Sequence, residues 1–266
     1  MLGGVTMPRF KAICAPVLGW ADDRRTDEQV FDRLTLQAWR AHLSDDRARR
    51  AADLITRIAP LSRGASVLDF GCGAGQIANS LASGGVRVTG IDRSSVAIVE
   101  ARRAAHPLCT FVEADWRYHA ITQPVDCALF WFTTLCAGKE RDLEALRIAR
   151  RSLKERGAML LETRHWDRMH HRFEARTERV TAEFTLVETH SYDPLSGMQR
   201  TDEVYSFTDK VIERRYQTRR YTFPELRDMC LLAGFQAVDG LDETGSRLSN
   251  ESERLVLRAQ AGSSLP

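Results

Sequence analysis

Three glycines at alternate positions follow an acidic residue in the stretch VLDFGCGAG, residues 67–75. The apolar run before them is typical of a buried parallel strand, and Gly71, Gly73 and Gly75 predict a turn that glycine makes most easily, with a helix directly after it. Backbone amides at the start of a helix favour anions or polar ligand groups. Asp69, at the predicted strand end, adds a negative charge that disfavours phosphate and favours a ligand bearing an amine.

The residue at position 76 separates two interpretations of these glycines. A dinucleotide fingerprint requires G-x-G-x-x-G, and Gln76 stands in place of its last glycine, so NAD binding is disfavoured. Residues 69–75 instead resemble motif I of the class I S-adenosylmethionine-dependent methyltransferases, D-x-G-x-G-x-G, at every fixed position. A glycine-rich turn without a ligand is the remaining alternative.

A second acid ends the next predicted strand, in the string GIDRS. Asp92 follows the glycine turn by about twenty residues, a spacing at which a carboxylate can accept hydrogen bonds from both hydroxyls of a ribose. The alternative is that Asp92 helps to cap the following helix, although Ser94 is better placed to do so. GIDRS resembles the second motif of the same family, in which this acid holds the ribose.

The third predicted strand is followed by Asp115 and Trp116. The resemblance implies that Asp115 meets the adenine amino group and that Trp116 packs on the ring. A carboxylate can accept from an exocyclic amine, and an indole offers a flat apolar face. Core packing is the alternative for Trp116.

The fourth predicted strand ends in FWFTT, residues 130–134. In the family this end lies beside the transferred methyl group, and the Asn/Asp-Pro-Pro-Tyr string used to methylate nucleic-acid amines and glutamine side chains is absent. An aromatic wall suits a small organic acceptor better, although Trp131 and Phe132 could also be core residues. The cofactor residues that the resemblance and the spacing imply are Asp69, Gly71, Cys72, Gly73, Gly75, Gln76, Asp92, Arg93, Asp115, Trp116 and Phe130.

Histidines follow the fifth predicted strand, in the string RHWDRMHH. Methyl transfer is an in-line displacement, so holding the acceptor at attack distance supplies much of the catalysis. An acceptor that arrives protonated also needs a general base, and imidazoles suit that task at neutral pH. We predict His165 as this base and Asp167 as its orienting partner; a polar loop that begins a surface helix is the alternative.

The order of elements predicts an α/β fold, a doubly wound, Rossmann-like sheet of seven mostly parallel strands. In such a sheet the ligand crevice lies outside the carboxyl ends of the strands. Strands are expected at 66–70, 86–91, 108–113, 125–130, 157–163, 235–241 and 253–260. Helices are expected at 27–58, with a break at 44–46 and Ser44 as a cap, and at 75–83, 95–105, 140–153 and 221–235.

The periodicity changes at residue 181. Three β-branched or aromatic segments, 181–192, 197–207 and 210–222, predict an inserted antiparallel β-meander. The predicted organisation is an N-terminal extension (1–26), a cofactor-binding core (27–180), the insertion (181–222) and the end of the core (223–266). In small-molecule methyltransferases of this family such an insertion serves as a lid or a dimer surface, so a homodimer is a further prediction.

Charge and cysteine content exclude several classes of protein. The 266 residues carry 38 basic and 36 acidic side chains, so no nucleic-acid partner is expected. The six cysteines are scattered without metal-ligand spacing, which predicts reduced thiols and no metal site. Neither a signal segment nor about 18 uninterrupted apolar residues is present, so we expect a cytoplasmic protein without a membrane partner.

These features together predict methyl transfer from S-adenosylmethionine, leaving S-adenosylhomocysteine, to an N or O atom of a small-molecule metabolite. One alternative keeps the cofactor but methylates a structured RNA, which the balanced charge disfavours. Another is a protein of the same fold that binds the nucleoside without methyl transfer, as a cyclase or a regulator.

Overall fold

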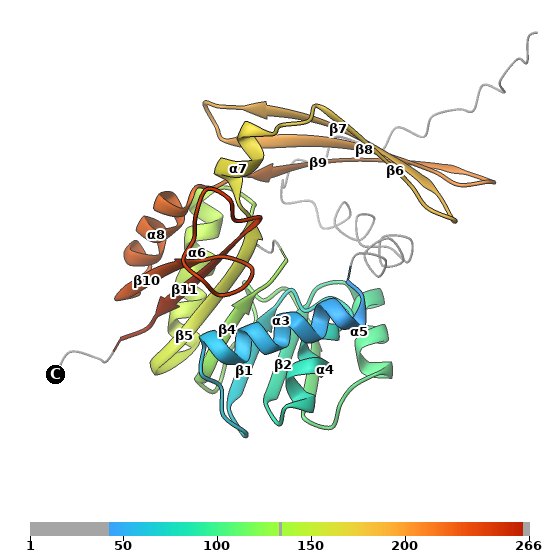
Figure 1. Cartoon of the computed structure of the whole chain (residues 1–266). Coiled ribbons are helices and arrows are strands. Elements are labelled where there is room, and N and C mark those ends of the chain that lie inside the picture. The colour runs from blue at the N-terminus through green and yellow to red at the C-terminus, as the bar shows by residue number, and fades with distance from the viewer. Residues whose placement is uncertain (1–42, 133–134, 263–266) are drawn as a thin grey trace, which may run out of the picture. The chain divides into compact units, whose positions relative to one another are not determined.

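The computed structural model describes residues 43–132 and 135–262 (Figure 1). The predicted extension 1–26 and the first part of the predicted helix, up to residue 42, lie outside the described residues. The chain divides into two compact units. The smaller contains Glu174–Thr218, and the larger contains the described parts of Asp22–Phe173 and Arg219–Pro266.

The larger unit is built on a seven-stranded sheet in the order β10-β11-β5-β4-β1-β2-β3. Strand β11 runs antiparallel to both of its neighbours, and the other neighbouring pairs are parallel. The strands are β1 (Ser66–Phe70), β2 (Arg87–Asp92), β3 (Cys109–Glu113), β4 (Val125–Phe130), β5 (Leu153–Arg164), β10 (Ala237–Leu241) and β11 (Arg254–Gln260).

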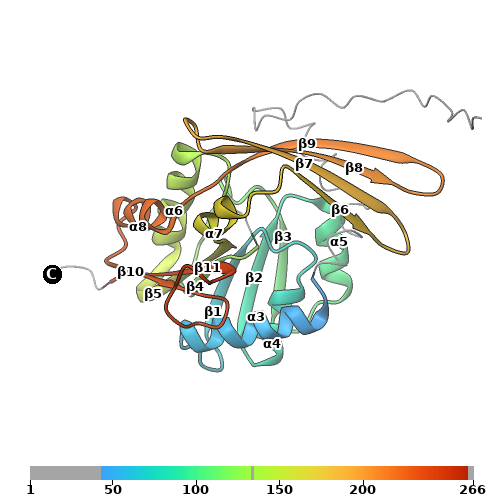
Figure 2. The ribbon, with the colours of Figure 1, turned by 45° about the horizontal axis from the view of Figure 1, so that its top comes forward.

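Helices cover both faces of this sheet (Figures 1 and 2). They are α3 (Asp45–Ile58), α4 (Gln76–Ser83), α5 (Ser95–Arg103), α6 (Lys139–Ser152) and α8 (Phe223–Leu232). Because side chains alternate along a strand, neighbouring residues of β1 enter different cores. Val67 packs in a cluster with residues of α3, α4 and α5, whereas Leu68 and Phe70 pack with residues of α6 and α8. The doubly wound α/β prediction is therefore confirmed.

Side-chain caps fix where three of these helices begin. The Ser44 hydroxyl accepts from the Arg47 amide at the start of α3, as predicted, and Ser94 does the same for α5 through the Ala97 amide. Thr222 and Glu225 form a reciprocal capping box at the start of α8. Capping satisfies backbone amides that have no partner within the helix.

The strand order reverses between β1 and β4. From β1 the chain continues outward through β2 and β3, and β4 and β5 then lie on the other side of β1. Ligands of open α/β sheets bind outside the carboxyl ends of the strands at such a reversal. A ligand is therefore expected beside the segments that follow Phe70 of β1 and Phe130 of β4.

The smaller unit is a four-stranded sheet in the order β6-β7-β8-β9. Its strands are β6 (Arg176–Val180), β7 (Thr185–Asp193), β8 (Met198–Ser206) and β9 (Val211–Arg219). The pairs β6 with β7 and β7 with β8 are antiparallel, so the inserted antiparallel sheet is confirmed. The sequence predicts three of these strands; β6, RTERV, is mostly exposed and lacks apolar alternation.

A short helix, α7 (Trp166–His171), follows β5. No helix within the described ranges is long and apolar enough to cross a membrane.

Candidate cofactor-binding site

The three predicted glycines form the turn between β1 and α4. All three have positive φ, at 75° for Gly71, 56° for Gly73 and 77° for Gly75. The Gly71 amide donates to the Ile91 carbonyl at 2.8 Å, which fixes the start of the turn beside the end of β2. Left-handed backbone of this kind favours glycine because it has no Cβ.

Gly75 is also required by its surroundings. It is the N-cap of α4, and a Cβ built on it would lie 2.5 Å from Cζ of Phe111. A Cβ built on Gly73 would have no neighbouring atom within 4 Å. The last glycine of the motif therefore lets α4 approach the sheet, whereas Gly73 is required mainly by its backbone conformation.

Asp92 ties the glycine turn to the end of β2. Its Oδ2 accepts from the Gly73 amide at 2.8 Å, and its Oδ1 accepts from the Ser94 amide at 2.9 Å. Burial raises the pKa of Asp92, and these two backbone hydrogen bonds oppose that increase. Each carboxylate oxygen has a second lone pair. Accepting from a ribose is thus compatible with both contacts, and the ribose role stays a prediction.

Asp69 is a buried carboxylate at the switch point. It lies on β1 between Gly90 of β2 and Leu129 of β4, and its exposed fraction is 3%. Among the residues that the structure describes, none donates a hydrogen bond to its carboxylate or pairs with it. Burial, and then the charge of Asp92, raise the pKa of Asp69 to about 7. A cation placed against it would favour the ionised form.

The remaining predicted residues of the turn have different surroundings. Cys72 is buried, its thiol donates weakly to the Gly73 carbonyl, and burial raises the thiol pKa, so it is a neutral packing group. Arg93 lies between Asp92 and the helix cap Ser94. Gln76 is the first residue of α4. The cofactor contacts of these residues remain predictions.

Asp115 is engaged by a residue that the sequence did not single out. The Arg117 Nε lies 2.9 and 3.0 Å from the two carboxylate oxygens, and the Arg117 amide donates to Oδ1 at 3.0 Å. Burial raises the pKa of Asp115, but the Arg117 hydrogen bonds outweigh it and hold the pKa below its ordinary value. If an adenine amine binds Asp115, it therefore shares an ionised carboxylate with Arg117.

Trp116 and Phe130 belong to one aromatic cluster with Phe70. Phe70 stacks on Phe130 with ring centroids 4.8 Å apart, and Trp116 meets both rings edge-on at 5.5 and 5.8 Å. The Phe130 side chain is fully buried, whereas Trp116 is partly exposed. Trp116 thus has core contacts along part of its ring, and the cofactor contact of Phe130, a residue that is 0% exposed, stays a prediction.

His165 joins the end of β5 to the segment before β11. Its Nδ1 lies 3.0 Å from the Ser252 carbonyl oxygen, so this nitrogen carries the proton and donates. Its Nε2 lies 3.5 Å from Oδ2 of Asp167, and the imidazole is only 4% exposed. The structure brings the predicted pair together, but the orienting contact on Nδ1 comes from a backbone carbonyl. The general-base role stays a prediction.

Glu162, which the sequence did not point to as a site residue, is buried at the carboxyl end of β5. Its Oε2 accepts from the Phe132 amide at 3.0 Å, and its Oε1 pairs with Arg254. Phe132 has φ of 59° and follows β4 at the strand reversal. An acid at the end of the apolar run AMLLET was the available signal.

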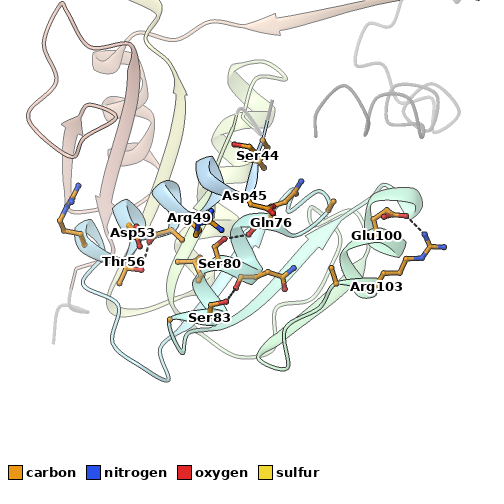
Figure 3. A pocket seen from close by; sticks show the side chains of 18 residues that line it. Ser44, Asp45, Arg49, Asp53, Thr56, Gln76, Ser80, Ser83, Glu100 and Arg103 are labelled. Atoms are coloured by element: carbon orange, nitrogen blue, oxygen red, sulfur yellow. Dashed lines mark hydrogen bonds and ion pairs between the residues drawn. The ribbon is translucent and has the colours of Figure 1, made fainter. Parts of the chain in front are cut away.

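A separate open groove of about 1190 Å³ lies among α3, α4 and α5 (Figure 3). Of the predicted cofactor residues only Gln76 lines it. Most of its labelled side chains come from the three helices, including the ion pair of Glu100 and Arg103, whereas Ser44 precedes α3 and Ala74 comes from the glycine turn. The groove belongs to the helix layer and not to the strand-end crevice. The described residues contain no group of three His, Cys, Asp or Glu side chains that could hold a metal ion.

Comparisons with known proteins agree with this geometry. Residues 67–157 match a family model described as a methyltransferase domain. Over 87 residues the chain is 42% identical to trans-aconitate 2-methyltransferase of Escherichia coli, an alignment that covers 32% of this chain and 34% of that enzyme. The chain thus spans about a third of the length of the curated relatives it matches.

Solved structures extend the likeness to most of the fold. The CcbJ methyltransferase from Streptomyces caelestis has a TM-score of 0.72 at 22% identity, covering 89% of this chain and 96% of its own. CalS10, an amino pentose methyltransferase from Micromonospora echinaspora with S-adenosylmethionine bound, has a TM-score of 0.66 at 18% identity, covering 86% and 97%. The solved structures therefore share the fold of this chain, and residues 67–157 resemble a methyltransferase domain.

Proposed function

We propose that this protein transfers a methyl group from S-adenosylmethionine to an N or O atom of a small-molecule metabolite. The observation that carries the proposal is the carboxylate of Asp69, which is 3% exposed beside the glycine turn and to which no residue in the described part of the chain donates a hydrogen bond. Burying a carboxylate without a hydrogen-bond partner is costly, and a ligand ammonium group would compensate that cost. The methionine part of the cofactor carries such an ammonium, and its sulfonium is a second positive charge.

The described residues also suit the rest of the cofactor. Asp92 accepts from the Gly73 amide through one oxygen and from the Ser94 amide through the other, and each oxygen has a lone pair left for a ribose hydroxyl. When bound, the cofactor supplies an electrophilic methyl group on its sulfonium sulfur. The protein's part is to hold the acceptor atom in line with that methyl, which alone can supply a large share of the rate.

The proposed acceptor class rests on the comparisons and on the segment after β4. The relatives named above include a trans-aconitate methyltransferase and an amino pentose methyltransferase. In the sequence FWFTT, at the end of β4, aromatic residues stand in place of a polar amide clamp, and among them Phe132 is only partly buried. These features support a small organic acceptor that bears an amine or an oxygen nucleophile.

The proposal is tested in two steps. Calorimetry with S-adenosylmethionine and S-adenosylhomocysteine should show one site per chain, and Asp69→Asn should weaken binding because it removes the charge that faces the ammonium. Mass spectrometry should then detect S-adenosylhomocysteine and a methylated product in reactions with a panel that contains trans-aconitate and amino pentoses. Tight cofactor binding without turnover of any compound, structured RNA included, would point to a non-methylating regulator. Turnover of RNA alone would overturn the small-molecule assignment.

A further inference from the structure

Phe132 has a backbone conformation that its side chain disfavours. Its φ of 59° lies in the left-handed region, which a bulky residue rarely adopts. Residues held in such conformations persist only when their surroundings enforce them, and they concentrate at functional sites. The position of Phe132, two residues beyond β4 at the strand reversal, places this strain at the edge of the ligand crevice.

Glu162 contacts the backbone of Phe132 directly. The last paired residues of β4 and β5 are Phe130 and Leu161, so Phe132 and Glu162 follow at the same edge of the sheet. The Glu162 carboxylate accepts the Phe132 amide proton at 3.0 Å. Its exposed fraction is 4%, so water is a poor substitute for either partner.

Two arginines complete the arrangement. Arg254, at the start of β11, pairs with the other oxygen of Glu162. The guanidinium of Arg47, on α3, lies over the Phe132 ring with Cζ 4.6 Å from the centroid. Burial and the neighbouring charge of Arg254 lower the pKa of Arg47, and Glu162 opposes that effect. The carboxylate therefore compensates the positive charge of both arginines.

We infer that Glu162 is a positioning residue, which holds Phe132 so that its ring forms a fixed wall of the acceptor site. The inference rests on the proposed methyl transfer. In-line displacement depends on the placement of the acceptor, and a displacement of about 1 Å can lower a rate by two orders of magnitude. Glu162 acts through Phe132, and the cofactor carboxylates Asp69 and Asp92 lie on other strands.

The test uses two Glu162 variants and one control variant in the full chain. Glu162→Ala removes the acceptor of the Phe132 amide, and Glu162→Gln keeps an oxygen that can accept it. Asp239→Asn is the matched control, because Asp239 pairs with Arg258 across β10 and β11 at 2.7 Å, away from the reversal. Deuterium uptake by the peptide that carries Phe132 should rise in Glu162→Ala, return toward wild type in Glu162→Gln and stay unchanged in Asp239→Asn.

Function is measured on the same variants. S-adenosylhomocysteine affinity should remain within about twofold of wild type, whereas kcat/KM for a panel compound that the wild type methylates should fall at least tenfold in Glu162→Ala. Combining it with Phe132→Ala should add little to the loss caused by Phe132→Ala alone, because coupled residues are not additive.

The two proposals fail in different ways. Unchanged deuterium uptake in Glu162→Ala would overturn the positioning role whether or not the wild type methylates anything. Wild-type kcat/KM in that variant, or full additivity with Phe132→Ala, would do the same. A wild type that forms no S-adenosylhomocysteine contradicts the proposed function, and the exchange measurement needs no acceptor.

Discussion

The carboxylate of Asp92 accepts a hydrogen bond from the amide of Gly73 at 2.8 Å, which joins the end of β2 to the middle of the glycine turn. Its other oxygen accepts from Ser94 at the start of α5. One side chain thus fixes the turn and the helix that flank the predicted ribose site. Preorganisation of this kind lowers the ordering cost of binding.

Asp92→Ala should therefore weaken cofactor binding. We expect a loss of about 1.5–3 kcal/mol, the range for hydrogen bonds to a charged group, or roughly 10- to 100-fold in Kd. Calorimetry with S-adenosylhomocysteine measures it. Asp126→Asn is the control, since that carboxylate pairs with Lys154 at the opposite, amino-terminal end of β4. Equal affinity of Asp92→Ala and wild type would remove the ribose assignment.

Asp69 makes cofactor affinity depend on pH near neutrality. Its pKa is raised to about 7, chiefly by burial, so the free protein holds this carboxyl largely protonated below that pH. An ammonium ligand requires the ionised form, so affinity should rise as pH increases from 6 to 8. Calorimetry across this range should show the rise in wild type and not in Asp69→Asn. A flat wild-type profile would contradict the pairing.

The raised pKa of Asp69 also affects the stability of the ligand-free protein, which should fall as pH rises. Because the folded pKa exceeds the unfolded one, the folded state binds more protons between about pH 4 and 7. The contribution of Asp69 to the free energy of unfolding should therefore decline as pH rises through that window. Urea unfolding at several pH values should show a smaller decline in Asp69→Asn. An identical pH dependence in the two proteins would show that Asp69 ionises as readily in the fold as in the unfolded chain.

The glycine turn offers a matched pair of substitutions. Gly73→Ala and Gly75→Ala both place a Cβ on left-handed backbone, at a cost of about 1–2 kcal/mol. Gly75→Ala also drives that carbon into Phe111, which should add about 1–3 kcal/mol. Urea unfolding should rank wild type above Gly73→Ala and Gly73→Ala above Gly75→Ala. Equal stability of the two variants would show that Phe111 moves aside without cost.

Sequence-based prediction succeeded where the signal is local. The turn at Gly71, Gly73 and Gly75 depends on backbone conformations that few other residues adopt, so the spacing of these glycines after an apolar run indicated it. The spacing to Asp92 placed a carboxylate at the end of β2, and the structure adds its contact with Gly73. The central parallel strands β1 and β4 were equally visible because their sequences are largely apolar and buried.

The rest depends on contacts between distant segments. The side chains of Glu162 and Arg254 pair although the two residues are 92 positions apart in the sequence, and no local pattern predicts such a contact. An aromatic residue in the sequence can pack either on a ligand or in the core. The contacts of Trp116 and Phe130 with Phe70 therefore become visible only in the structure. An exposed edge strand such as β6 has no buried face to impose alternation on its sequence.

His165 can be tested as a base separately from its contact with the backbone. Its Nδ1 donates to the Ser252 carbonyl, so only Nε2, which lies near Asp167, could take a proton from the substrate that is methylated. His165→Asn keeps a donor near the position of Nδ1 and removes Nε2, whereas His165→Ala removes both. If the imidazole is the base, both variants should lose turnover by about 10²- to 10⁴-fold, while S-adenosylhomocysteine affinity stays at the wild-type value. Recovery of turnover in His165→Asn would instead assign His165 to holding the segment before β11 in place, with the proton leaving by another route.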